Sequence, residues 1–203
     1  MASQQRDMLR AIHDDPADDA PRRVYADWLL ERGDPRGELI HLQCELATFG
    51  TRDPRRKKVL AREQALLRTH NATWGPFHDP RFAWAFERGF VSGFGHQGVF
   101  HHEGPNEAMW IRFFLDNTAL FIVTGTGGSA DVVAKWFVQG HGNSSTLAYT
   151  IEPTGKRVRV VTAGKKHAFT AELTARSLEV RLPRRKKPTT LLLAGTVADS
   201  RYS

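Results

Sequence analysis

A run of histidines and glutamates near the middle of the chain has the residue types that bind metal ions. Imidazole and carboxylate groups are good ligands for zinc, and the stretch "HQGVFHHEGPNE" supplies His96, His101, His102, Glu103 and Glu107. Two of the histidines are adjacent, however, and neither the HExxH arrangement nor a Cys/His finger spacing is present. We interpret the stretch as a glycine-rich loop with incidental histidines, and we expect no metal and no cofactor. A metal-dependent enzyme that uses these histidines is kept as an alternative.

A glycine-rich segment and the only cysteine complete the set of residues suited to chemistry. Glycines precede an expected helix in "TGTGGSADVV" (124–133), but the lysine of a P-loop and the GxGxxG spacing are missing. Cys44 lies in an apolar helical stripe, where thiols are usually inert, and the chain has no GxSxG motif. We therefore expect no catalytic residues and a protein that is not an enzyme.

The composition is that of an ordinary globular protein. Of the 203 residues, 40% are apolar and 25% are charged, which fits packed domains rather than disorder. The first residues, "MASQQRDMLRAIHDD", lack the apolar core of a signal peptide. No apolar run approaches the roughly 20 residues that span a bilayer. We expect a soluble, cytoplasmic protein without a membrane span.

A net charge of +7 favours acidic partners, nucleic acid among them. Two RRKK clusters form electrostatic patches, and their members are Arg55, Arg56, Lys57, Lys58, Arg184, Arg185, Lys186 and Lys187. Short charge runs usually lie on exposed turns or helix faces. Neither cluster contains the interleaved aromatic residues of a single-strand binding site. We interpret both as solvated surface, with nucleic-acid binding that is not sequence-specific as an alternative.

The first eighty residues carry apolar side chains at helical spacing and predict four helices. The connection between the second and third helices, "ERGDPRGE" (31–38), has the residues that fix a tight turn. Gly33 suits a left-handed C-cap, Asp34 an N-cap and Glu38 a capping box. These residues therefore predict a helical hairpin, with partner docking as a second use of the loop.

The tetrapeptide "YADW" (25–28) is the most distinctive part of the helical half. Tyr25 and Trp28 are three residues apart and share one helical face, so we expect them in a buried stripe together with Val24 and Leu29. The alternative is a recognition surface for another protein. Its candidate residues are Tyr25, Asp27, Trp28, Arg32 and Arg36.

After Trp74 the pattern changes to the alternation of β-strands. A hairpin is expected over 81–95 with its turn at Arg88-Gly89, and a second hairpin turns at Asp116-Asn117. A short helix capped by Ser129 follows. Five further strands are expected at Leu147–Ile151, Arg157–Thr162, His167–Leu173, Ser177–Leu182 and Leu191–Val197. Turn residues separate these strands at intervals of about eight to twelve residues. This spacing is typical of an all-β sandwich or barrel.

The segment "DDPADDAPRRVYADWLLERGDPRGELIHLQCEL" (14–46) resembles a bacterial repeat-companion domain, and the similarity extends over about residues 6–91. The family's usual form carries the same Y-A-D-W, E-R-G-D-P-R-G-E and L-Q-C elements. The resemblance implies a short helical module that commonly caps leucine-rich repeats, and it implies no enzymatic activity. This chain departs from the family pattern because no leucine-rich repeats follow Val91.

Residues of about 108–197 resemble a lipocalin-like small bacterial β-barrel. The shared pattern is a strand, a tight turn, a strand, a short helix with a Val-Ala-x-Trp-Phe core, and further strands. Asn117 replaces the turn glycine of that pattern, which asparagine can do because it tolerates positive φ. A small apolar ligand held in the barrel would contact the candidate pocket residues Phe113, Phe114, Phe121 and Tyr149. The interpretation that we favour is that these aromatic rings simply fill the interior.

Together these patterns predict an α+β protein. An N-terminal helical hairpin module of about four helices (1–80) precedes an antiparallel lipocalin-like β-barrel or half-barrel with one inserted short helix (81–203). Within the second part, the hairpin 81–95 leads to a barrel-like core over 108–197. The predicted function is that of a non-catalytic adaptor or binding module whose helical part engages a protein partner.

Overall fold

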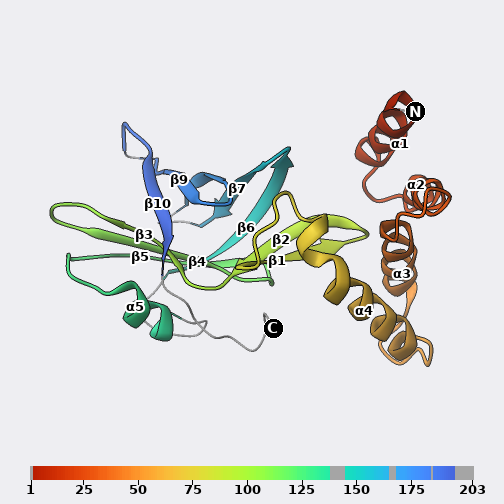
Figure 1. The fold of residues 1–203 in the computed structure, drawn as a ribbon, viewed down its shortest axis with the longest axis horizontal. Helices are drawn as coiled ribbons and strands as arrows, with labels where there is room; N and C mark the ends of the chain where they lie inside the picture. The colour runs from red at the N-terminus through yellow and green to blue at the C-terminus, as the bar shows by residue number, and fades with distance from the viewer. Residues whose placement is uncertain (1, 138–144, 165–167, 184, 195–203) are drawn as a thin grey trace. The chain divides into compact units, whose positions relative to one another are not determined.

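The structure is a computed structural model, and it confirms the α+β architecture (Figure 1). It describes residues 2–137, 145–164, 168–183 and 185–194. The chain forms two compact units. The helical unit contains Met1–Asn71 and Phe86–Phe90, and the β unit contains Ala72–Ala85 and Val91–Ser203.

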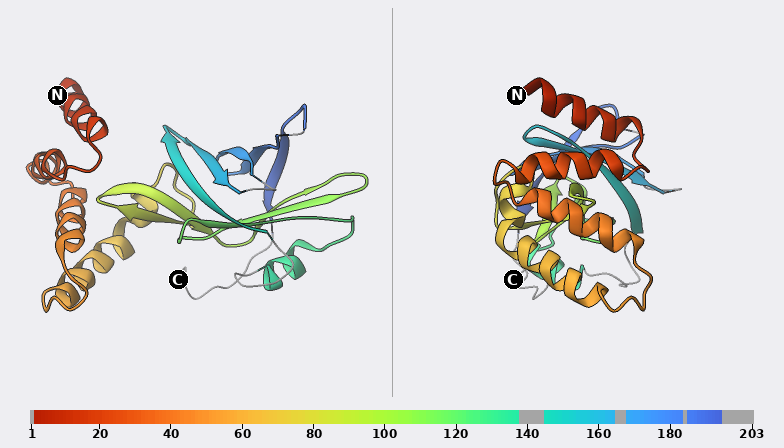
Figure 2. Two further views of the ribbon diagram at one scale, coloured as in Figure 1. Left: turned by 180° about the vertical axis from the view of Figure 1, so that it is seen from behind. Right: turned by 90° about the vertical axis from the view of Figure 1, so that its right-hand side faces the viewer.

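Four helices begin the chain, as the sequence predicts: α1 (Ala2–Asp14), α2 (Ala20–Leu30), α3 (Arg36–Thr48) and α4 (Arg56–Trp74). They follow one another in chain order in the right-hand view of Figure 2. α2 and α3 approach closely at Gly37, where a Cβ atom would lie 2.4 Å from the carbonyl oxygen of Ala26. Glycine is required at this position because any side chain would force the two helices apart.

The connection between α2 and α3 has the predicted turn geometry. Gly33 has a φ of 71° and donates its N–H to the carbonyl of Leu30, while the Asp34 N–H reaches the carbonyl of Leu29. These two bonds form the Schellman arrangement that ends helices. Asp34 also accepts the N–H of Arg36, at 2.9 Å, from the position before Pro35, which is the N-cap of α3 in place of the predicted Asp34.

Glu38 does not close a capping box, in contrast to the prediction. Its carboxylate pairs with the guanidinium of Arg62 on α4, with Nη2 and Oε2 2.7 Å apart. This hydrogen bond lowers the pKa of Glu38, against a smaller opposing effect of burial. The residue therefore joins two helices rather than finishing one of them.

The core of the helical unit contains residues of α1, α2 and α3. Its buried members are Ile12, Tyr25, Ala26, Leu29, Ile40 and Cys44. Val24 was predicted in the same stripe, but its side chain is 58% exposed. The prediction was wrong because Val24 points away from Ala26 and Leu29 on a helix of 3.6 residues per turn.

A two-stranded hairpin, β1 (Phe82–Glu87) and β2 (Phe90–His96), follows α4. Its turn has positive φ at Arg88 (49°) and Gly89 (83°), as a two-residue hairpin requires. Gln43 of α3 fixes this turn within the helical unit. Its Oε1 accepts the Gly89 N–H at 2.6 Å and its Nε2 donates to the Phe86 carbonyl at 3.0 Å.

Eight antiparallel strands close into a barrel in the order β10-β3-β4-β5-β6-β7-β8-β9. Their bounds are β3 (Val99–Glu103), β4 (Ala108–Phe113), β5 (Thr118–Thr124), β6 (Ser145–Thr154), β7 (Arg157–Ala163), β8 (Thr170–Leu173), β9 (Ser177–Arg181) and β10 (Thr189–Ala194). The turn at Asp116-Asn117 is confirmed, with a φ of 59° at Asn117. Parts of two predicted strands, at 167 and 195–197, lie outside the described residues.

The prediction of a loop over 96–107 was wrong, because β3 lies within it. Phe100 pairs with Ile111 of β4, and Leu193 of β10 pairs with Phe100 from the other side. The strand was not predicted because this segment is rich in glycine and histidine and lacks the apolar alternation by which strands are recognised. Buried Val99 and Phe100 are adjacent, so both faces of β3 are covered.

A short helix, α5 (Ala130–Trp136), lies outside the barrel alongside β3 to β5 (Figure 1). Val133, Ala134 and Phe137 pack on the outer side of Trp110 and its neighbours. Arg112 is fully buried and donates from Nη1 to the carbonyls of Ala134 and Phe137, both at 3.3 Å. The cation thus neutralises the negative end of α5.

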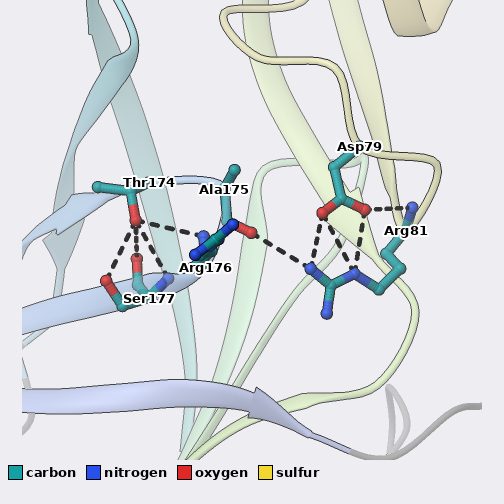
Figure 3. Close-up of polar contacts among 6 residues, drawn as sticks. All are labelled: Asp79, Arg81, Thr174, Ala175, Arg176 and Ser177. Atoms are coloured by element: carbon teal, nitrogen blue, oxygen red, sulfur yellow. Dashed lines mark hydrogen bonds and ion pairs between the residues drawn. The ribbon is translucent and has the colours of Figure 1, made fainter.

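The segment before β1 is attached to the β8–β9 turn (Figure 3). Arg81 binds Asp79 with Nη2 and Oδ2 2.6 Å apart, and it also donates to the carbonyl of Ala175 at 3.3 Å. Hydrogen bonding to Arg81 lowers the pKa of Asp79. On the turn itself, Thr174 Oγ1 accepts the N–H of Ser177. These bonds fix β1 against one end of the barrel.

Candidate functional site

Trp28 is the centre of a side-chain stack on α2. Tyr25 is buried, and its ring lies 5.8 Å from the indole of Trp28 at an interplanar angle of 17°. The guanidinium of Arg32 lies 3.8 Å above the same indole, and its Nη1 donates to the Trp28 carbonyl at 2.8 Å. Such a cation–π contact is worth about 0.5–1 kcal/mol at an exposed site. Tyr25 therefore supports Trp28 from the core, whereas Arg32 covers it from the solvent side.

The remaining candidates of the helical unit have different surroundings. Asp27 is exposed and its Oδ1 lies 2.8 Å from Nε2 of His41. Arg36 is half-buried at the start of α3. Exposed Val24 lies one helical turn before Trp28, and it belongs to the same surface. The sequence analysis did not predict Val24 as a surface residue, because an aliphatic side chain on a helix is usually expected in the hydrophobic core.

The four candidate pocket residues of the barrel do not gather around one cavity. Phe113 and Tyr149 have ring centroids 5.2 Å apart in an aromatic cluster at one end. Phe121 contacts the ring of Phe169, at 5.7 Å, on another part of the wall. Phe114 packs in the cluster beneath α5, outside the barrel. All four are buried by neighbouring side chains.

Tyr149 has a structural hydrogen-bonding role. Its hydroxyl accepts the N–H of Phe94 at 2.9 Å and lies 2.6 Å from the carbonyl oxygen of the same residue. The carbonyl of Phe114 lies 3.0 Å away. Nearby, Asn117 donates from Nδ2 to the carbonyl of Ser92. Side chains of the barrel thus bind backbone groups of Ser92 and Phe94 in β2, which pairs only with β1 among the strands that the structure describes.

His96 is fully buried in the aromatic cluster. Its Nε2 accepts the N–H of Phe113 at 3.2 Å, which requires the neutral ring. The pKa of His96 is lowered to about 3, mainly by burial and to a smaller extent by the charge of Arg112, against an opposing effect of the Gln97 backbone. The imidazole therefore acts as a neutral hydrogen-bond acceptor within the core.

The other residues of the 96–107 segment that a metal site would have used have separate partners. His101 stacks on Trp110 with ring centroids 3.8 Å apart. His102 Nδ1 lies 3.2 Å from a carbonyl of β10. Glu103 accepts a backbone N–H ahead of α5, and Glu107 pairs with an arginine of the second basic cluster. Among the residues that the structure describes, no three metal-ligating side chains come together.

A hollow of about 290 Å³ lies where β7 ends, β8 begins and β9 ends. Its lining residues are Thr162, Ala168, Phe169, Thr170, Arg181, Leu182 and Pro183. The floor is apolar, because Phe169 is buried against Phe121. The alternation of Phe169 with Ala171 and Leu173 in the sequence predicts that the Phe169 side chain points inward. No local sequence pattern, however, predicts that the ends of β7, β8 and β9 lie together.

The two basic clusters differ in their pairing. Arg55 binds Asp53, with Nη2 and Oδ2 2.9 Å apart, while Lys57 and Lys58 are exposed in the first turn of α4. The Arg55 hydrogen bond lowers the pKa of Asp53. In the second cluster Arg185 pairs with Glu107, and the lysines at 186 and 187 are exposed. Arg184 lies outside the described residues.

No helix in the described part of the chain has both the length and the apolar character needed to cross a membrane. Comparison with known protein families, with curated proteins and with solved structures finds no match to this chain.

Proposed function

We propose that the protein is a non-catalytic binding module whose helical unit engages another protein through the exposed side of α2. The observation that supports this proposal is the stack in which Tyr25 and Arg32 fix the orientation of Trp28, with exposed Val24 one turn away. Tryptophan, tyrosine and arginine are enriched among the residues that dominate binding energy at interfaces. A ring held in place before binding loses little side-chain entropy on association.

The chemistry of this surface defines the partner. Val24 is removed from water only if an apolar side chain covers it. Asp27 on α2 and Glu31 directly after it are exposed, and although Asp27 contacts His41 and Glu31 lies 3.7 Å from Arg32, both carboxylates stay accessible to a cation on the partner. We infer a protein segment that presents an apolar side chain next to a lysine or arginine. The resemblance to a repeat-companion domain, a module that lies against a neighbouring element in its family, supports the same proposal.

Photo-crosslinking in extract of the native cell tests this surface. The full-length protein carries p-benzoylphenylalanine in place of Val24, and a matched protein carries it in place of Thr69, an exposed residue of α4. We expect a partner that crosslinks at position 24 and not at position 69. A further Trp28→Ala substitution in the first protein should lower the yield of that crosslink at least about tenfold, because it removes the proposed anchor.

Two outcomes would contradict the proposal. The same set of proteins could crosslink at both positions, which would indicate non-specific collision. Alternatively, the yield at position 24 could be unchanged by Trp28→Ala in a protein whose helical circular dichroism is intact. In either case the stack on α2 is part of the fold and not a docking surface.

A second candidate function is non-specific binding to nucleic acid through α4. Lys57, Lys58 and Arg68 are exposed on this helix and have no ion pair among the described residues. Arg62, in contrast, is paired with Glu38. Phosphate contacts release counterions, so affinity for a DNA or RNA duplex would fall steeply with salt. Fluorescence anisotropy that detects no binding at physiological salt would exclude this function.

A further inference from the structure

The hollow at the ends of β7, β8 and β9 has two chemically different sides. Phe169, which is 2% exposed, forms an apolar floor together with the half-buried Leu182. The hydroxyl of Thr162 offers little to a ligand, because it donates to the Phe169 carbonyl at 2.9 Å and accepts the Phe169 N–H at 2.7 Å. Among the described residues that line the hollow, Arg181 has the only charged side chain.

The cation at the rim has capacity for a further anion. Arg181 donates from Nη2 to Glu179 at 3.2 Å, and the side chains are 66% and 43% exposed, respectively. Exposed pairs of this kind are weak, typically about 0–1 kcal/mol, and a guanidinium has five N–H donors. The Arg181 guanidinium therefore keeps N–H donors for a further anion, and its pairing with Glu179 is weak.

Positive charge continues along the chain beyond the hollow. Pro183 leads into a turn that is closed by the Arg185 N–H bond to the Leu182 carbonyl, at 3.1 Å. Lys186 and Lys187 follow it, both exposed and without an ion pair among the residues described. Such a cluster raises the local concentration of small anions.

We propose that this hollow binds a small amphipathic anion, with its apolar part on Phe169 and Leu182 and its anionic group on Arg181. The volume of about 290 Å³ is just below the range of about 300–1,000 Å³ found for small-molecule sites, so the ligand is a short aliphatic or aromatic carboxylate, phosphate or sulfate ester. This site lies within the β unit, and it is independent of the surface proposed on α2. The failure of one proposal therefore leaves the other standing.

Amide-resolved NMR titration of the full-length protein tests the site with octanoate, using acetate and octylammonium as probes of head and chain alone. We expect octanoate to shift the amides of Phe169, Thr170 and Leu182 in a saturable way. Acetate should bind at least about tenfold more weakly because it lacks apolar surface. Octylammonium should also bind at least about tenfold more weakly, because its charge is repelled by Arg181.

Matched substitutions separate the site from general surface charge. Arg181→Gln should weaken octanoate at least about tenfold through loss of the charge-assisted hydrogen bond. Arg159→Gln is the control, because Arg159 is an exposed β7 arginine that pairs with Glu152 at 3.3 Å and does not line the hollow. Leu182→Ser should weaken octanoate without changing the response to acetate.

Three results would overturn the proposal. The first is equal binding of octanoate and octylammonium, which would indicate an apolar surface without preference for charge. The second is equal loss of affinity in Arg181→Gln and Arg159→Gln, which would indicate general electrostatic attraction. The third is the absence of saturable shifts at the three amides while wild-type thermal unfolding stays cooperative.

Discussion

At the scale of single residues, the β unit contains buried polar side chains that form hydrogen bonds within the core. His96 is the clearest case, because it is fully buried and its pKa is lowered to about 3. The unfolded chain would bind a proton at this residue near pH 6.5. Between about pH 3 and 6.5 the unfolded state therefore holds more protons than the folded state, and stability falls as the pH is lowered.

This linkage predicts an acid sensitivity that belongs to one side chain. From pH 7 to pH 5 the His96 contribution lowers the free energy of unfolding by about 2 kcal/mol. His96→Gln removes the titrating group. We therefore expect the free energy of unfolding of this variant to fall by about 2 kcal/mol less than that of the wild type between pH 7 and pH 5, whatever the stability of the variant at pH 7. Urea unfolding of both proteins at the two pH values measures the difference. Equal losses in the two proteins would show that His96 is not the group responsible.

The hydroxyl of Tyr149 gives a second prediction at this scale. It serves the N–H and carbonyl of Phe94 and approaches the carbonyl of Phe114. Tyr149→Phe leaves these buried groups unpaired and should destabilise the protein by about 1–3 kcal/mol. Tyr25→Phe is the matched control, because the Tyr25 hydroxyl makes one part-buried bond, to Gln5. Equal effects in urea unfolding would contradict the special role of Tyr149.

At the scale of elements, local signals in the sequence predicted the turns and the end of α2. The N-terminal caps were predicted less well, because Glu38 pairs with Arg62 and the Ser129 side chain makes no capping bond to α5. Gly33, Arg88-Gly89 and Asn117 all have the positive φ that their sequence context requires. These features depend on residues that are neighbours in the chain, which is why they could be recognised. The strand β3 could not be recognised, because its regularity comes from pairing with β4 and β10 and not from its own composition.

Buried polar residues were missed for a related reason. Gln43 binds Gly89, which is 46 residues away, and Arg112 binds Ala134, which is 22 residues away. Sequence patterns predict polar residues at the surface unless a partner is known. The same limit applies to the candidate sites. Phe113, Phe121 and Tyr149 lie on strands as predicted, whereas Phe114 follows the end of β4, and the distribution of the four rings over separate clusters depends on strand register. The similarity to a repeat-companion domain stays a prediction.

The attachment of α5 can be tested at this scale. Arg112 donates to the carbonyls of Ala134 and Phe137 at the end of α5. Arg112→Met keeps an unbranched apolar stem and removes the donors, so the terminal carbonyls lose a partner that counters the helix dipole. We expect faster amide hydrogen exchange across α5, by about tenfold, for a loss of roughly 1.4 kcal/mol of local stability. Unchanged exchange in α5, or an equal increase throughout β7, would contradict this role.

At the scale of the whole molecule, the chain passes between its two compact units more than once. The turn of the first hairpin, Phe86–Phe90, belongs to the helical unit, while most of β1 and β2 belongs to the β unit. Gln43 is the residue that fixes this turn to α3, through Gly89 and Phe86. Its Nε2 also donates to Glu63 of α4 at 2.6 Å. One amide side chain therefore connects three segments of the helical unit.

Gln43→Leu should consequently loosen the helical unit and leave the barrel strands protected. The substitution leaves the buried Gly89 N–H without the Gln43 acceptor, which costs about 1–3 kcal/mol, and it also removes the donor to the Phe86 carbonyl. Hydrogen exchange measured by mass spectrometry should accelerate in α3 and in the turn 86–90, with no change in β6 and β7, whose contacts lie within the other unit. Gln64→Leu, at an exposed position of α4, should change neither region. Acceleration in β6 and β7 equal to that in α3 would mean that the two units unfold as one, because a local defect in α3 would then open the whole chain.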